Sequence, residues 1–111
     1  MTQININAGN LQGHVILHDP LTMLQLAEYE EAFEAAVKID KRLVTARSNL
    51  ALIPALVSCV KEWHITLFPE TLTLDTFPGI GTGISKPDIV KVVVDITNAL
   101  SKYFKGESPN A

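Results

Sequence analysis

The segment from Ser85 to Gly106 limits the possible folds most, because it combines an apolar stripe with signals for a helix start and a helix end. Ser85 is a favoured N-cap residue, Pro87 suits a first helical turn, and Asp88 follows the cap by three residues, as in a capping box. Gly106 is placed to end the helix. The apolar positions recur every three or four residues: Ile89, Val92, Val93, Ile96, Leu100 and Tyr103 or Phe104. The sequence therefore predicts a well-defined helix here, although its β-branched residues lower helix propensity.

The length and composition indicate one small folded domain. The chain has 111 residues, of which 47% are hydrophobic and 19% charged, which is too apolar for intrinsic disorder. The longest apolar run, residues 50–57, is interrupted by Pro54 and is far shorter than the about 20 residues of a membrane-spanning helix. No secretory signal is recognised at the N-terminus. The single cysteine, Cys59, excludes an internal disulfide and is typical of a reducing compartment, so we expect a cytoplasmic protein.

The N-terminal residues have the pattern of a β-hairpin. Residues 3–6 alternate polar and apolar side chains, residues 7–10 are turn formers, and residues 11–18 form a second apolar run. A two-stranded ribbon alone is marginally stable in water. We therefore expect this hairpin to lie on the helices or to pair with another chain.

Two further helices are expected between the hairpin and the last helix. Thr22 can cap a helix that runs to about Ile39, and a second helix is predicted over residues 48–63, with Leu50 on its apolar face. Pro54 requires this second helix either to begin near Ile53 or to bend. The predicted fold is thus mainly α: a three-helix bundle with a small N-terminal β-hairpin, in one helical domain over residues 1–106, followed by a short tail at 107–111.

Residues 64–84 show no clear period, and aromatic residues gather at the start of this stretch and within it. Trp63, Phe68 and Phe77 are three of only seven aromatic residues in the chain. One interpretation is that they close the core beneath a long loop. The other is that they anchor a partner protein, because large aromatic side chains dominate binding hot spots. They are the candidate partner-binding residues.

No pattern in the sequence predicts catalysis, a metal site or a cofactor. His14 and His18 would lie about 13 Å apart on a strand, too far to share one metal. Cys59 lies in an apolar segment typical of an inert core thiol. The glycine-rich residues 79–83 precede Ser85 and Lys86 in the wrong order for a phosphate-binding loop. We therefore expect no enzyme, no cofactor and no metal.

The charge distribution argues against nucleic acid as a partner. The formal net charge is −3, and the basic residues Lys38, Lys41, Arg42 and Arg47 follow an acidic helix that contains Glu28, Glu30, Glu31 and Glu34. Bases at the C-terminal end of a helix are favoured by its dipole. A nucleic-acid binder usually has a basic face instead.

Several short strings resemble a family of small tailed-phage and prophage proteins, some described as tail-assembly-chaperone-like. They are residues 62–64 (Glu-Trp-His), 68–70 (Phe-Pro-Glu) and 76–78 (Thr-Phe-Pro), followed by the capped helix; the helix entry at 19–22 and the C-terminal residues 105–111 are also similar. The likeness covers most of residues 15–111. The chain departs from the family at residues 79–83, which are richer in glycine and less basic. The family has no catalytic residues to transfer.

The resemblance implies a non-enzymatic viral protein that acts through protein–protein interaction in tail assembly, as a chaperone or as a minor structural component. Its partner would be a phage tail component, and it would work in the host cytoplasm or stay in the virion. The alternative is a phage-encoded inhibitor of a host defence complex, which would compete with nucleic acid through carboxylates such as Glu28 and Glu34. Self-association into a homo-oligomer is left open, and neither nucleic acid nor a membrane is expected as a partner.

Overall fold

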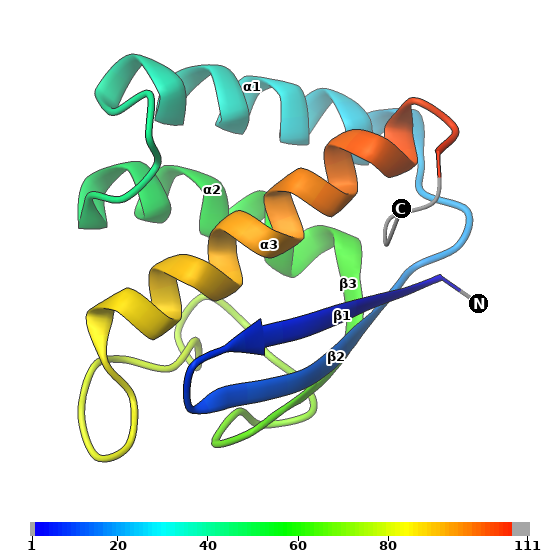
Figure 1. The fold of residues 1–111 in the computed structure, drawn as a ribbon. Helices are drawn as coiled ribbons and strands as arrows, with labels where there is room; N and C mark the ends of the chain where they lie inside the picture. The colour runs from blue at the N-terminus through cyan, green and yellow to red at the C-terminus, as the bar shows by residue number, and fades with distance from the viewer. Residues whose placement is uncertain (1, 108–111) are drawn as a thin grey trace.

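The computed structural model describes residues 2–107 and shows three helices packed on a three-stranded sheet (Figure 1). In chain order the elements are β1 (Gln3–Ala8), β2 (Leu11–Leu17), α1 (Met23–Ile39), α2 (Ala46–Cys59), β3 (Val60–Ile65) and α3 (Lys86–Phe104). The predicted tail at 107–111 lies outside the described residues except for its first residue.

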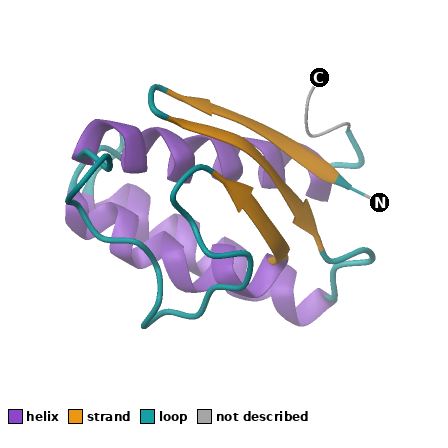
Figure 2. Ribbon diagram, turned by 90° about the horizontal axis from the view of Figure 1, so that it is seen from below, coloured by secondary structure: helices purple, strands orange, loops and turns teal. Residues whose placement is uncertain are grey.

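The fold is α+β, so the predicted helical bundle with a separate hairpin is wrong. Of residues 2–107, 47% are helical and 20% are in strands or bridges, and the three strands form one antiparallel sheet in the order β1-β2-β3. The helices cover one face of this sheet (Figure 2). Strand β2 therefore lies in the middle of the sheet, and it pairs with β1 on one side and with β3 on the other.

The error lies in residues 60–63, which the helical spacing assigned to the second helix. In the structure α2 ends at Cys59, and β3 starts at once with Val60, whose amide donates to the Leu56 carbonyl oxygen. The strand is irregular at its start, since Ile16 pairs with Glu62 but Leu17 pairs with Val60, and this shift allows Val60, Trp63 and Ile65 all to be buried. β-Branched and aromatic residues fit a pleated sheet. Pairing with β2 therefore outweighs continuation of the helix.

Gly13 permits the close approach of β3 to β2. Its φ of 145° is rarely adopted by other residues, and a Cβ atom there would lie 1.9 Å from the His64 carbonyl oxygen. Gly13 pairs with Ile65 in the β2–β3 register. The pairing of β3 with β2 thus depends on a glycine at position 13, because any side chain there would collide with β3.

Other predicted features are confirmed. The hairpin forms, α1 begins after Thr22 with a capping box completed by Gln25, and α3 begins after the N-cap Ser85. Helix α2 starts at Ala46 and continues through Pro54, so the predicted alternative of a start near Ile53 is wrong. Gly106 follows α3 with a φ of 82°, as expected for a residue that ends a helix.

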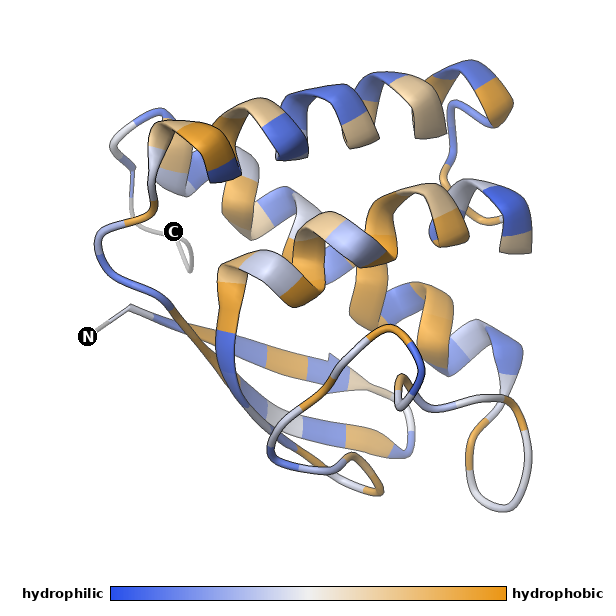
Figure 3. Ribbon diagram, turned by 180° about the vertical axis from the view of Figure 1, so that it is seen from behind, coloured by the Kyte–Doolittle hydropathy of each residue, from blue (hydrophilic) through white to orange (hydrophobic). Residues whose placement is uncertain are grey.

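The core lies between the sheet and the helices, and α1 forms an outer layer against α2 (Figure 3). Helix α3 packs on β1, and the buried Tyr29 of α1 donates its hydroxyl proton to the Thr97 carbonyl oxygen of α3 at 2.8 Å. This hydrogen bond joins α1 to α3. Among residues 2–107, no helix combines the length and apolarity needed to cross a bilayer.

Candidate interaction groove

The three predicted partner-binding aromatic residues come together in one cluster. The Trp63 ring centroid lies 6.0 Å from that of Phe68 and 5.9 Å from that of Phe77, and the two phenyl rings are 5.8 Å apart. Two of these pairs meet edge to face, a favoured aromatic geometry. The cluster fastens the segment 66–85 to the end of β3.

The cluster is mostly internal, which limits what it can contact. Trp63 is 1% exposed, while Phe68 and Phe77 are partly buried against the core. The Trp63 amide also donates to the Glu70 carbonyl oxygen at 2.9 Å, so the segment returns along the outer edge of β3. Trp63 therefore supports the loop from below, whereas Phe77 reaches a surface hollow.

That hollow is an apolar groove of about 470 Å³ between α2, the loop before α3 and the first turns of α3. Three large side chains stand at its surface: Leu50 is 66% exposed, Leu74 57% and Ile80 66%. The other lining residues are Ala46, Asn49, Ile53, Phe77, Pro78, Gly79, Lys86, Ile89 and Val90. Exposed apolar side chains gathered in one concave surface are typical of a binding site.

A second hollow of about 530 Å³ extends the first along α3. The two share Lys86 and Val90, and we call them together the α2–α3 groove. The second part is lined by Arg42, Val44, Lys86, Pro87, Val90, Lys91 and Val94. Its floor is aliphatic, and its three charged residues are all basic.

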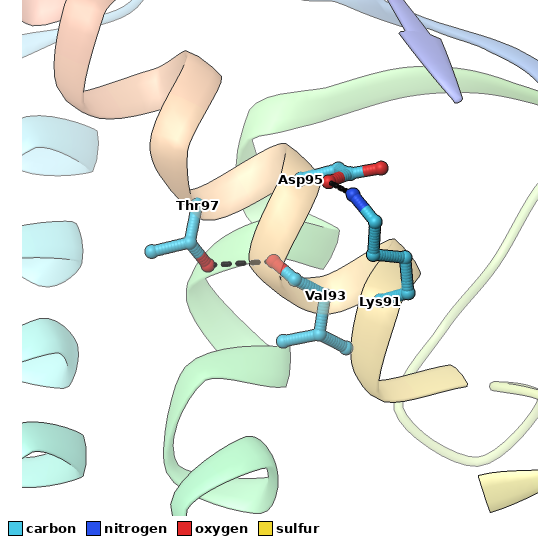
Figure 4. Close-up of polar contacts among 4 residues, drawn as sticks. All are labelled: Lys91, Val93, Asp95 and Thr97. Atoms are coloured by element: carbon cyan, nitrogen blue, oxygen red, sulfur yellow. Dashed lines mark hydrogen bonds and ion pairs between the residues drawn. The ribbon is translucent and has the colours of Figure 1, made fainter. Parts of the chain in front are cut away.

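Basic side chains border the α2–α3 groove although the chain as a whole is acidic. Arg42, Lys86 and Lys91 border it, and the N-terminal residues of α2 and α3 both line it, where helix dipoles are positive. The Lys91 ammonium contacts Asp95 one turn further along α3 (Figure 4). Asp88, the acid in the first turn of α3, instead accepts from the Asn10 amide at the hairpin turn. The groove thus suits an apolar ligand that carries negative charge.

Figure 4 also shows that polar side chains lie on different sides of α3. The Thr97 hydroxyl donates to the Val93 carbonyl oxygen at 2.7 Å on the buried side, while Lys91 and Asp95 occupy another side of the helix. Thr97 is fully buried, and this bond satisfies its hydroxyl. The polar residue in the core is therefore structural.

The connection from α1 to α2 forms one border of the groove and is held by two polar side chains. The Asp40 carboxylate accepts from the amides of Arg42, Val44 and Thr45. These bonds, first of all that from Val44, hold the pKa of Asp40 below its usual value. Asn49 donates to the carbonyl oxygens of Leu43 (2.8 Å) and Thr45 (2.9 Å). The border is therefore a fixed turn.

Asn49 also brings an unsatisfied acceptor to the lining of the groove. The residue is 4% exposed, and its side-chain oxygen has no hydrogen-bond partner among residues 2–107. Buried polar atoms normally have a partner.

His14 and His64 are remote in the sequence but lie beside each other on β2 and β3. Their ring centroids are 4.8 Å apart across β2 and β3, and Glu62 lies 3.1 Å from His64 Nε2. Within the described part of the chain, no group of three His, Cys, Asp or Glu side chains could hold a metal ion.

The Cys59 side chain is fully buried. Burial, helped by the charge of Glu28, raises the pKa of its thiol to about 11.

Sequence reasoning missed the groove residues on α2 and in the loop. Leu50 was placed on the apolar face of the second helix, but in the structure it lies at the protein surface. Leu74 and Ile80, in the loop before α3, are exposed as well. A usable signal was present, since an apolar loop rich in glycine and proline has more hydrophobic side chains than one short segment can bury.

Comparison of the chain with protein-family models, with curated proteins and with solved structures found no match. The resemblance to tail-assembly proteins therefore rests on the short strings in the sequence.

Proposed function

We propose that this chain is a non-catalytic protein-binding module whose α2–α3 groove holds an apolar, acid-flanked segment of another protein. The observation that carries the proposal is the exposure of Leu50, Leu74 and Ile80 around one concave surface. Removal of such aliphatic surface from water is favourable by about 25 cal/mol per Å², before the entropy cost of association is subtracted. The basic border then selects partners with negative charge.

The groove is also preorganised for binding. The aromatic cluster fixes the loop on one side, and Asp40 and Asn49 fix the turn on the other. A rigid surface loses little conformational entropy when a partner binds. These features favour a dedicated binding surface over a loosely packed loop.

In the tail-assembly role that the resemblance implies, the partner is a virion component with apolar segments that aggregate when left exposed. Covering such a segment in the α2–α3 groove would keep the component soluble until assembly. This role needs no bound cofactor and no reacting group. It agrees with the sequence-based expectation of a non-enzymatic interaction protein.

A co-expression experiment tests the proposal. Each virion protein encoded next to this gene is produced alone, with the wild-type chain, or with the Leu50→Glu variant, and its soluble fraction is measured. We expect one virion protein to become soluble only with the wild-type chain, because a carboxylate at Leu50 places charge in the apolar groove and repels acidic segments.

Ile39→Glu is the matched control, since Ile39 is also an exposed aliphatic residue (46%) but does not line the groove. It should solubilise the virion protein as the wild-type chain does. If Leu50→Glu also does so, the groove is not the binding site. If the wild-type chain solubilises no virion protein but blocks a host defence complex, the inhibitor function replaces tail assembly.

A further inference from the structure

We propose that the α2–α3 groove also binds helix α1 of a second copy of this chain, so that copies associate head to tail. This inference rests on the proposed function, because it uses the same groove as a protein-binding site. It adds an identified occupant: the start of α1, with its exposed apolar residues and its acidic outer face.

Helix α1 exposes large apolar side chains at its start. Met23 is 79% exposed and Leu24 70%, the largest values among the exposed large hydrophobic residues of residues 2–107. Leu24 shares the outer face of the helix with Ala27 and Glu31, at spacings of three and seven residues. Helix α1 thus presents an apolar tip followed by negative charge.

The acidic outer surface of α1 complements the basic border of the groove. The outer surface of α1 contains Glu28, Glu30, Glu31 and Glu34, all exposed. The groove is bordered by Arg42, Lys86 and Lys91; because Lys91 already contacts Asp95, Arg42 and Lys86 carry most of the complementarity. With Leu24 of one copy in the apolar part of the groove, Glu28 and Glu31 lie one and two turns further along the helix, within reach of this basic border. The chain therefore carries both halves of a complementary pair.

The start of α1 and the groove lie at opposite ends of the molecule. Helices α1 and α2 run antiparallel, so the start of α1 lies at the end of the molecule away from the start of α2 (Figure 1). The groove is lined by the first residues of α2 and α3, at the other end. One chain cannot bring its own α1 tip to its own groove without unfolding. A second copy can, and both of its surfaces remain available.

This arrangement is a heterologous interface, in which different patches meet. Repetition of such an interface produces rings or open chains of copies instead of a closed two-fold dimer. It also means that another protein must displace α1 of the neighbouring copy to enter the groove. Self-association would therefore keep the apolar groove covered until a partner is present.

Two variants with one blocked surface each test the inference. Leu50→Glu blocks the groove and keeps α1, whereas Leu24→Glu blocks α1 and keeps the groove. Sedimentation velocity should show that the wild-type mass rises with concentration above the 12.1 kDa of one chain, while each variant alone stays at 12.1 kDa. An equal mixture should form a dimer of twice this mass and nothing larger, because one intact surface of each kind remains.

The inference is overturned if the wild-type chain stays at the monomer mass over the whole concentration range, or if the two variants do not combine on mixing. It is also overturned if Leu24→Glu assembles like the wild-type chain. Ile39→Glu serves as the control and should assemble normally. Raised salt should weaken the wild-type assembly, since exposed charges form part of the contact.

The same variants separate this inference from the proposed function. Leu24→Glu keeps its groove, so it should still solubilise the virion partner even though it no longer self-associates. If it remains monomeric and solubilises the partner as well as or better than the wild-type chain, both proposals stand. Solubilisation by Leu50→Glu would contradict the proposed function, while failure of the two variants to combine would contradict only self-association.

Discussion

The Cys59 thiol shows how its position in the fold sets its chemistry. It is fully buried at the end of α2, and burial together with the nearby charge of Glu28 raises its pKa to about 11. Because the thiolate is the reactive form, we expect alkylation at pH 8 to be about a hundredfold slower than in the denatured chain. Iodoacetamide labelling followed by mass spectrometry measures both rates. Equal rates would show that the thiol is accessible.

Asp40 gives the turn beside the groove a dependence on pH. The amides of Val44, Arg42 and Thr45 stabilise its charged form, so its pKa in the folded chain lies below the ordinary value of 3.8. The stabilisation is thus present above that value and is lost as the pH falls through the lower pKa of the folded state. We expect Asp40→Ala to lower stability at pH 7 and to make the acid loss of stability shallower. Urea unfolding at several pH values tests this, and identical pH profiles would contradict it.

At the residue scale, the sequence allowed good predictions where a local interaction decides the structure. The side chains of Thr22 and Ser85 cap their helices as predicted, because an N-cap bonds to an amide only three residues away. The exposure of Leu50 was not predictable in this way. Whether an apolar residue at helical spacing is buried depends on which element covers it, and no segment within residues 2–107 covers Leu50.

Among the elements, β3 depends on a residue in another strand. Gly13→Ala would place a Cβ atom 1.9 Å from the His64 carbonyl oxygen and force an unfavourable φ. We expect a loss of about 1–3 kcal/mol or more in the free energy of unfolding. Thermal and urea denaturation measure the loss. Gly81→Ala is the control, since no atom of the described residues lies within 4 Å of the Cβ position there, and it should change stability by less than about 0.5 kcal/mol. Equal effects of the two substitutions would contradict this role of Gly13.

The same strand explains why the fold class was predicted incorrectly. Residues 48–63 satisfy a helical pattern throughout, and the change from helix to strand at Val60 has no glycine or proline to mark it. Pairing with β2 decides the outcome, and such a long-range partner is not visible in a local pattern. The hairpin was predictable because its two strands and its turn lie next to each other in the sequence.

For the whole molecule, the account requires that the groove can be altered without unfolding the chain. Leu50 is 66% exposed, so Leu50→Glu should change the free energy of unfolding by less than about 0.5 kcal/mol. Urea denaturation of the variant and the wild-type chain checks this. A large loss would mean that Leu50 packs in the core, and the binding experiments would then need a different groove variant.

The candidate site was predicted only in part, again because distant segments form it. The sequence indicated the aromatic residues, which do cluster, but Trp63 lies beneath the surface and Phe77 alone of the three lines the groove. The groove forms only where the first turns of α2 and α3 come together. Their relative position depends on how all the elements pack, which a local sequence pattern does not reveal. The basic border of the groove was likewise not predictable from the net charge of −3, because Arg42, Lys86 and Lys91 come together only in the folded chain.

The most direct test of the central claim, that the α2–α3 groove is a protein-contact surface, is site-specific photo-crosslinking from Ile80 in cells that contain the partner genes. A photoreactive residue at Ile80, which is 66% exposed, would lie in the groove, and one at Ile39 would lie outside it. The account predicts that only the Ile80 position is crosslinked to a virion protein or to α1 of a second copy, as identified by mass spectrometry. No adduct from Ile80, or the same adducts from both positions, would contradict it.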